Sequence, residues 1–223
     1  MDERLKLLLL DKYDNFVDKT VLIIGLGGVG SYAVEMLCRS MFKRLIIVDN
    51  DTIDITNLNR QLMTNINNVG KYKTDVLFDR IKSINPNCEI IKITEFITKE
   101  NIDILFSYDV DYVIDACDTI LTKLEIIKYC LKNKVKFISS MGMANRIDAS
   151  KIEVTSLDKT YNDPLARKIR SLLKKENIKG KVMVAYSTEL PKKIDKLGSI
   201  ATVPATAGVM CANFIINDIL KGC

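Results

Sequence analysis

The feature that most constrains the fold is a glycine-rich run, residues 25–30 (GLGGVG), between an apolar run and a helix-forming segment. Val21–Ile24 is short, wholly apolar and rich in β-branched side chains, which is typical of a buried parallel strand. Ser31–Met41 repeats apolar side chains at helical spacing. A strand, a glycine turn and a helix in this order present free N–H groups and the positive end of a helix dipole to an anion. The sequence therefore predicts a nucleotide-binding α/β unit.

The four glycines of this run have separate expected roles. Gly25 permits a tight turn after the strand, and Gly27 removes a side chain where a phosphate approaches the backbone. Gly28 belongs to the same phosphate-facing loop, and Gly30 lets the helix pack closely on the sheet. A glycine-rich turn without a ligand is the alternative interpretation.

A second apolar run, Leu45–Val48, ends at an acidic residue, Asp49. In a doubly wound sheet, a carboxylate at the end of the second strand accepts hydrogen bonds from ribose hydroxyls. A turn or helix-capping role is the alternative for Asp49. The spacing makes Asp49 a candidate nucleotide ligand.

The chain contains no histidine, which excludes histidine bases, histidine triads and histidine-ligated metals. None of its cysteines forms a CxxC pair, so we expect reduced thiols and no zinc site. Cys117 is expected to be a small buried residue and not a nucleophile. The six cysteines are Cys38, Cys88, Cys117, Cys130, Cys211 and Cys223.

Strand-forming and helix-forming segments alternate along the first 140 residues, which predicts a Rossmann-like, doubly wound, mainly parallel sheet of the α/β class. The chain is expected to form one domain, with a nucleotide-binding core over 1–145 and a substrate-facing part over 146–223. Besides those already named, the expected elements of the core are helices near Glu3–Lys12, Lys71–Ser83, Lys99–Phe106 and Thr122–Asn133, and strands at Glu89–Ile93, Tyr112–Ala116 and Val135–Ser140.

The regular alternation of strand-forming and helix-forming segments ends after Ser140. Two segments, Lys151–Ser156 and Lys181–Ser187, alternate apolar and polar residues and predict half-exposed, antiparallel strands. Asp163 and Pro164 between them are suited to begin a helix. A loop is expected over 191–200, and an apolar closing helix over 202–220.

The formal net charge is +5, and basic residues are concentrated between Arg167 and Lys196. This segment predicts either a solvated helix face with a basic loop or a patch that contacts nucleic-acid phosphates. No apolar run approaches the roughly 20 residues that span a bilayer, and the run at Leu7–Leu10 is too short for a signal peptide. We therefore expect a cytoplasmic protein with no membrane partner.

Several ordered motifs extend the glycine run. They are Asp49-Asn-Asp51, Asn57-Leu-Asn-Arg60-Gln61, Val69-Gly-Lys-Tyr-Lys73, Ile84-Asn-Pro86 and Val113-Ile-Asp-Ala-Cys-Asp118 with Lys123 after it. Together they resemble the ThiF/MoeB/ubiquitin-activating-enzyme superfamily of adenylating enzymes. The resemblance implies an ATP site on a ThiF/MoeB-like fold, with carboxylate activation as its chemistry.

The resemblance also implies a role for individual residues. Asp51, Asn57, Arg60, Gln61 and Lys73 would surround ATP, and a guanidinium suits phosphate because it binds in a bidentate manner. Asp118 would be the key acid and would hold Mg²⁺ together with the ATP phosphates. Arg4 would reach the ATP of the other subunit, which implies a homodimer. The residues expected to take part in catalysis are Asp118, Arg60, Lys73 and Arg4.

Motifs in the last third narrow the resemblance. They are Ser140-Met-Gly142, Asp158-Lys-Thr160, Asp163-Pro-Leu-Ala-Arg167 and Tyr186-Ser-x-Glu-x-Pro191. They are similar to those of the tRNA threonylcarbamoyladenosine dehydratase family. That resemblance implies ATP-dependent dehydration of this nucleoside in the tRNA anticodon loop, with ATP, Mg²⁺ and optionally a monovalent cation. It is also compatible with a sulfur-transfer protein as a partner.

Two other classes remain open from the sequence. The first is adenylation of the C-terminus of a ubiquitin-like sulfur-carrier protein, which would use the same ATP site. The second is a NAD-dependent oxidoreductase or a nucleotide-sensing module, which would share only the glycine loop and Asp49.

Overall fold

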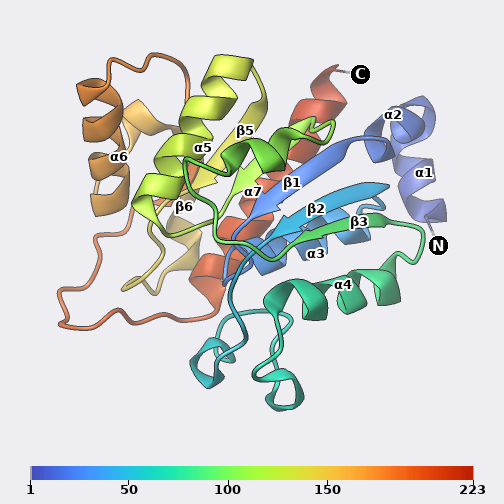
Figure 1. The fold of residues 1–223 in the computed structure, drawn as a ribbon, viewed down its shortest axis with the longest axis horizontal. Coiled ribbons are helices and arrows are strands. Elements are labelled where there is room, and N and C mark those ends of the chain that lie inside the picture. The colour runs from blue at the N-terminus through green and yellow to red at the C-terminus, as the bar shows by residue number, and fades with distance from the viewer. Residues whose placement is uncertain (1, 223) are drawn as a thin grey trace.

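A computed structural model describes residues 2–222, and its centre is one seven-stranded sheet (Figure 1). The strand order is β3-β2-β1-β4-β5-β7-β6, and every neighbouring pair is parallel except β6 with β7. The predicted mainly parallel sheet with antiparallel pairing near the C-terminus is confirmed. The strands are β1 (Thr20–Ile24), β2 (Arg44–Val48), β3 (Glu89–Ile93), β4 (Tyr112–Asp115), β5 (Lys136–Ser140), β6 (Ile152–Ser156) and β7 (Met183–Ser187).

Helices cover both faces of the sheet because its central strands are apolar on both sides. In β1, Val21 and Ile23 pack in one hydrophobic core, and Leu22 and Ile24 pack in the other, as the two-residue period of a strand requires. The first core includes residues of α2, α3, α4 and α7, and the second includes residues of α5 and α6. The helices are α1 (Glu3–Leu9), α2 (Tyr13–Val17), α3 (Gly30–Arg39), α4 (Lys73–Ile84), α5 (Ile120–Asn133), α6 (Pro164–Lys175) and α7 (Thr202–Gly222).

Three local predictions were wrong. The helix expected over Lys99–Phe106 is only a short 3₁₀ turn, η4 (Ile102–Phe106), because the Asn101 side chain accepts the N–H of Thr98 and holds an irregular bend before it. The first helix ends at Leu9, since Leu10 adopts a φ of 52°. Strand β7 is buried and not half-exposed, because both of its faces are covered: Val184 and Tyr186 pack in one hydrophobic core and Ala185 packs in the other.

Helix α7 is long and apolar enough to cross a membrane by length and composition alone. Its buried face instead packs against α3, where a Cβ on Gly208 would lie 2.2 Å from the carbonyl oxygen of Val29. Ala207, Cys211 and Ile215 of α7 are fully buried. We conclude that α7 is a core helix that supports the first turn of α3.

Candidate functional site

The predicted site residues gather where the central strands end. Ile24 of β1 pairs with Val48 of β2 on one side and with Asp115 of β4 on the other. The loops that follow these three strands therefore meet at the carboxyl edge of the sheet, which is where doubly wound folds bind ligands. Figure 1 shows the long 49–72 excursion at this edge, with α1 and α2 at the opposite edge.

The glycine loop is held tightly against the turn after β4. Gly25 has a φ of 86°, and a Cβ there would lie 2.7 Å from the carbonyl oxygen of Ala116. A Cβ on Gly30 would lie 1.8 Å from the carbonyl oxygen of Gly25. Only glycine fits at either position, so the loop stays packed against the turn after β4 and leads directly into the N-terminus of α3, where free N–H groups suit an anion.

Asp49, Asp51 and Lys73 form a charged cluster beside the glycine loop. One oxygen of Asp49 accepts the backbone N–H of Leu26 at 2.7 Å, and the other accepts the N–H of Asp51 at 2.8 Å. The Lys73 ammonium lies 2.7 Å from the Asp51 carboxylate and 3.6 Å from that of Asp49. Asp49 thus fixes the glycine loop, and its oxygens keep lone pairs for a ribose hydroxyl.

The Asn57–Gln61 segment lies against the other side of the glycine loop. The Arg60 guanidinium donates to the carbonyl oxygen of Thr56 at 2.8 Å, and the Asn57 side chain accepts the N–H of Asp54. The Gln61 amide nitrogen would lie 3.8 Å from a Cβ on Gly27, where the backbone is otherwise open. Gln61 is 6% exposed, and its Oε1 is the buried side-chain oxygen without a hydrogen-bond partner among residues 2–222. An unpaired amide oxygen beside an open glycine backbone fits a polar ligand such as a nucleotide.

Asp118 and Arg4 lie in different places. Asp118 follows β4 at the carboxyl edge, two residues after the Ala116 carbonyl that contacts Gly25, and it is exposed. Arg4 is exposed on α1, at the edge where β1 begins. The structure therefore gathers Asp118 with the glycine loop but does not bring Arg4 to the same site within one chain.

Sequence patterns did not reveal a buried charged network directly beneath this edge. Asp115 and Lys123 are both fully buried, and their carboxylate and ammonium lie 2.8 Å apart. Ser139 of β5 donates to the Asp115 carboxylate at 2.6 Å. Burial alone would lower the pKa of Lys123, but the Asp115 charge outweighs burial and raises that pKa, which favours the charged ammonium. The network holds the start of α5 to the ends of β4 and β5.

A second unpredicted group is Arg146, which is 3% exposed. Its guanidinium donates to the carbonyl oxygens of Gly142, Asn162 and Glu189 and contacts the Asp163 carboxylate at 3.4 Å. Burial lowers the pKa of Arg146, against the opposite effect of Asp163. Because these carbonyls belong to three separate loops, Arg146 fixes the C-terminal loops at the same edge of the sheet.

Burial disfavours the reactive thiolate form of the cysteines between residues 2 and 222. Burial raises the pKa of Cys117 well above its usual value, and the neighbouring Asp115 carboxylate raises it further. Burial also raises the pKa of Cys38 to about 11 and of Cys211 to about 12. The five cysteines between residues 2 and 222 are free thiols, and Cys223 lies outside the described residues. Within the same part of the chain, no group of three acidic or thiol side chains could hold a metal ion.

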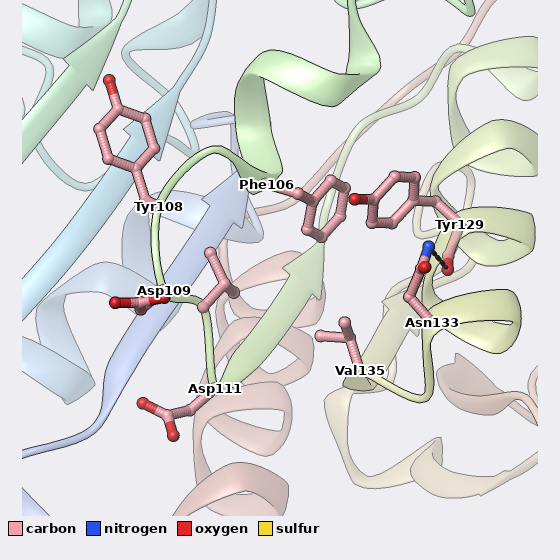
Figure 2. Close-up of a pocket in the computed structure, with 8 residues that line it drawn as sticks. Phe106, Tyr108, Asp109, Asp111, Tyr129, Asn133 and Val135 are labelled. Carbon is pink, nitrogen blue, oxygen red and sulfur yellow. Dashed lines mark hydrogen bonds between the residues drawn. The ribbon is translucent and has the colours of Figure 1, made fainter.

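A cavity of about 310 Å³ lies away from this site. Figure 2 shows its lining, with Phe106 stacked on Tyr129 at a centroid distance of 3.8 Å and with Asp109 and Asp111 near the start of β4. Asp111 accepts the backbone N–H of Thr20, the first residue of β1, so the cavity belongs to the opposite edge of the sheet. We therefore base the candidate site on the loop geometry and not on this cavity.

The ThiF family model matches residues 2–222, and the chain therefore belongs to the ThiF family. A tRNA threonylcarbamoyladenosine dehydratase of Bacillus subtilis is 41% identical over 223 residues, which cover 92% of this chain and 88% of that protein. The crystal structure of the E. coli tRNA N6-threonylcarbamoyladenosine dehydratase in complex with ATP superimposes with a TM-score of 0.92 at 34% identity, covering 97% of this chain and 92% of that one. The complex of that protein with AMP gives a TM-score of 0.93 at 34% identity, over 100% and 94% of the two chains.

Proposed function

We propose that this chain catalyses the ATP-dependent dehydration, by cyclisation, of threonylcarbamoyladenosine in the tRNA anticodon loop. The observation that carries the proposal is likeness over the whole chain, including the C-terminal third, to a dehydratase crystallised with ATP. The open glycine loop and the unpaired amide oxygen of Gln61 support a nucleotide site here. We further propose a cytoplasmic location for this activity.

The chemistry suits a site without histidine or an ionised thiol. A carboxylate is a poor acyl donor, so its oxygen first attacks the α-phosphorus of ATP and displaces pyrophosphate. A nitrogen of the substrate's own ureido group then attacks the activated carbonyl, loses its proton and displaces AMP. Because the nucleophile belongs to the substrate, ring closure needs proximity and charge stabilisation more than a protein nucleophile.

The residues at the edge have matching proposed roles. Arg60 and Lys73 would bind the phosphates, and Asp49 would bind the ribose. The exposed Asp118 carboxylate fits a magnesium ion shared with phosphate oxygens, since Mg²⁺ needs only one or two protein carboxylates. When bound, that ion neutralises charge on the triphosphate. The same residues would serve the alternative reaction, adenylation of the C-terminus of a ubiquitin-like sulfur-carrier protein. The two reactions therefore differ in which carboxylate accepts the adenylyl group of ATP.

ATP–pyrophosphate exchange tests which substrate carboxylate accepts the adenylyl group of ATP. We expect exchange to rise when tRNA carrying threonylcarbamoyladenosine is added, because the activating step requires its carboxylate. Unmodified tRNA transcript is the matched control and should give no rise. Exchange stimulated by a ubiquitin-like sulfur-carrier protein, and not by the modified tRNA, would instead establish the alternative.

We also propose a homodimer in which Arg4 acts across the interface. Helix α1 and the residue after it expose Arg4 beside Leu7, Leu8 and Leu10, which are 72%, 77% and 71% exposed. Three large apolar side chains this exposed within four residues favour an interface at this helix. A second copy is the simplest partner because a two-fold interface would carry each Arg4 to the other chain.

This arrangement predicts complementation between two inactive variants. Arg4→Ala and Asp118→Asn should each be inactive, but mixed subunits should recover about a quarter of the wild-type turnover, since half the dimers would contain one intact site of two. Turnover after refolding the mixed subunits measures this. No recovery, together with a monomer in light scattering, would contradict the homodimer.

Three further predictions from the sequence stay predictions: a monovalent cation, a sulfur-transfer protein partner, and the division of one domain into a nucleotide-binding core (1–145) and a substrate-facing part (146–223).

A further inference from the structure

The basic segment between Arg167 and Lys196 divides into two parts at opposite edges of the sheet. Helix α6 follows its N-cap Asp163, which contacts Arg146 at the carboxyl edge, and it runs away from that edge. The lysines after its middle, and those before β7, are therefore remote from the nucleotide loops. The 190–200 loop follows the end of β7, so its lysines lie at the same edge as the candidate site.

Side chains of the 190–200 loop combine positive charge with exposed apolar surface. The loop contains Lys192, Lys193 and Lys196 and a single acidic residue, Asp195. All three lysines are exposed. Its apolar side chains are also exposed, at 66% for Leu190, 54% for Ile194, 85% for Leu197 and 45% for Ile200. An apolar patch surrounded by lysines is typical of a surface covered by an anionic partner.

One asparagine fixes both ends of this loop. The Asn145 carbonyl oxygen accepts the N–H of Lys192 at 2.8 Å, and its own N–H donates to the Gly198 carbonyl oxygen at 2.8 Å. The Asn145 side chain accepts the N–H of Gly198 at 2.6 Å. Asn145 has a φ of 62°, a conformation that asparagine tolerates better than most residues. These hydrogen bonds anchor the loop at both ends. Figure 1 shows it as the long segment leading into α7.

A second asparagine connects the loop to the candidate nucleotide site. The Asn59 side-chain amide donates to the Ser199 carbonyl oxygen at 3.0 Å, and its oxygen accepts from the Arg60 guanidinium at 2.9 Å. One side chain therefore separates the loop from the arginine assigned to the ATP phosphates. A partner seated on the loop would lie close to the phosphate end of the site.

We propose that the 190–200 loop is the surface that binds the single-stranded anticodon loop of the RNA substrate. Lysine ammonium groups would contact phosphates, and the exposed aliphatic side chains would pack against unstacked bases, which is how single-stranded loops differ from a duplex as a target. This inference rests on the proposed tRNA substrate. It assigns RNA binding to this loop and not to the far end of α6.

A matched pair of triple variants tests the proposal. The variant K192A/K193A/K196A removes three charges from the loop, and the control K174A/K175A/K179A removes three charges from the far end of α6 and the turn after it. With tRNA carrying threonylcarbamoyladenosine, we expect the loop variant to raise Kd about tenfold or more. The negative slope of log K against log salt should become shallower by about 2, because each phosphate contact on a single strand contributes about −0.7 to it. The control should change both values by much less.

A second variant separates apolar contacts from charge. The double substitution I194S/L197S should weaken binding without changing the salt slope, and both side chains are exposed enough that the fold should tolerate it. Failure of the wild-type protein to dehydrate the tRNA would contradict the proposed function. An active wild type whose loop variant binds no worse than the control would overturn only this inference. A changed oligomeric state in light scattering with unchanged RNA binding would also overturn it, in favour of a second copy on the loop.

Discussion

Replacing Asp118 with asparagine is expected to reduce turnover about a thousandfold and to leave the protein folded. Asp118 is exposed after β4, so its substitution removes no buried contact and should change the free energy of unfolding by less than about 0.5 kcal/mol. The carboxylate charge is the part that holds Mg²⁺ against the ATP phosphates, and groups that stabilise developing charge commonly contribute 10²- to about 10³-fold. AMP release with modified tRNA measures the loss.

Asp103→Asn is the matched control, because Asp103 is another exposed aspartate on the short η4 turn. It should retain full turnover. If Asp118→Asn also retained full turnover with an unchanged melting temperature, Asp118 would have no role in the reaction.

The second large effect that we expect is a loss of stability when the buried Lys123 charge is removed. Replacing Lys123 with methionine should lower the free energy of unfolding by about 3–5 kcal/mol, since it leaves the fully buried Asp115 carboxylate without its ion pair. Urea denaturation measures the change. Lys128→Met on the same helix removes a partly exposed lysine paired with Glu125 and Glu176, and it should lower stability by less than about 1 kcal/mol.

The double variant Asp115→Asn/Lys123→Met distinguishes a charge effect from a packing effect. It removes both charges, and asparagine still offers an oxygen to Ser139. We expect it to recover most of the stability lost in the single variant. A double variant as unstable as Lys123→Met would show that packing of the lysine chain, and not the charge, holds α5 to the sheet.

Local patterns were sufficient for most of the fold. The bounds of β3 match those expected from its sequence, and Asp163 caps α6 through a hydrogen bond from the Ala166 N–H, as the Asp-Pro pair predicted. Such features depend on neighbouring residues alone. The burial of β7 was not predictable in this way, because it depends on helices elsewhere in the sequence that cover both faces of the strand.

In the candidate site, too, some features follow from the local sequence and others depend on distant residues. Asp49 lies beside the glycine loop because the ends of β1 and β2 are adjacent in any sheet of this topology. Nothing in the periodicity of α5 distinguishes the buried Lys123 from the partly exposed Lys128. The difference arises because Lys123 faces the end of β4 across the helix–sheet contact, where a carboxylate compensates its burial.

The mass of the modified nucleoside is the most direct test of the proposed dehydration. Incubation of this protein with ATP, Mg²⁺ and tRNA carrying threonylcarbamoyladenosine, followed by nuclease digestion and mass spectrometry, should show the nucleoside lighter by one water molecule, with one AMP released for each. An unchanged nucleoside mass, under conditions in which the protein binds both ATP and the tRNA, would contradict the proposed dehydration.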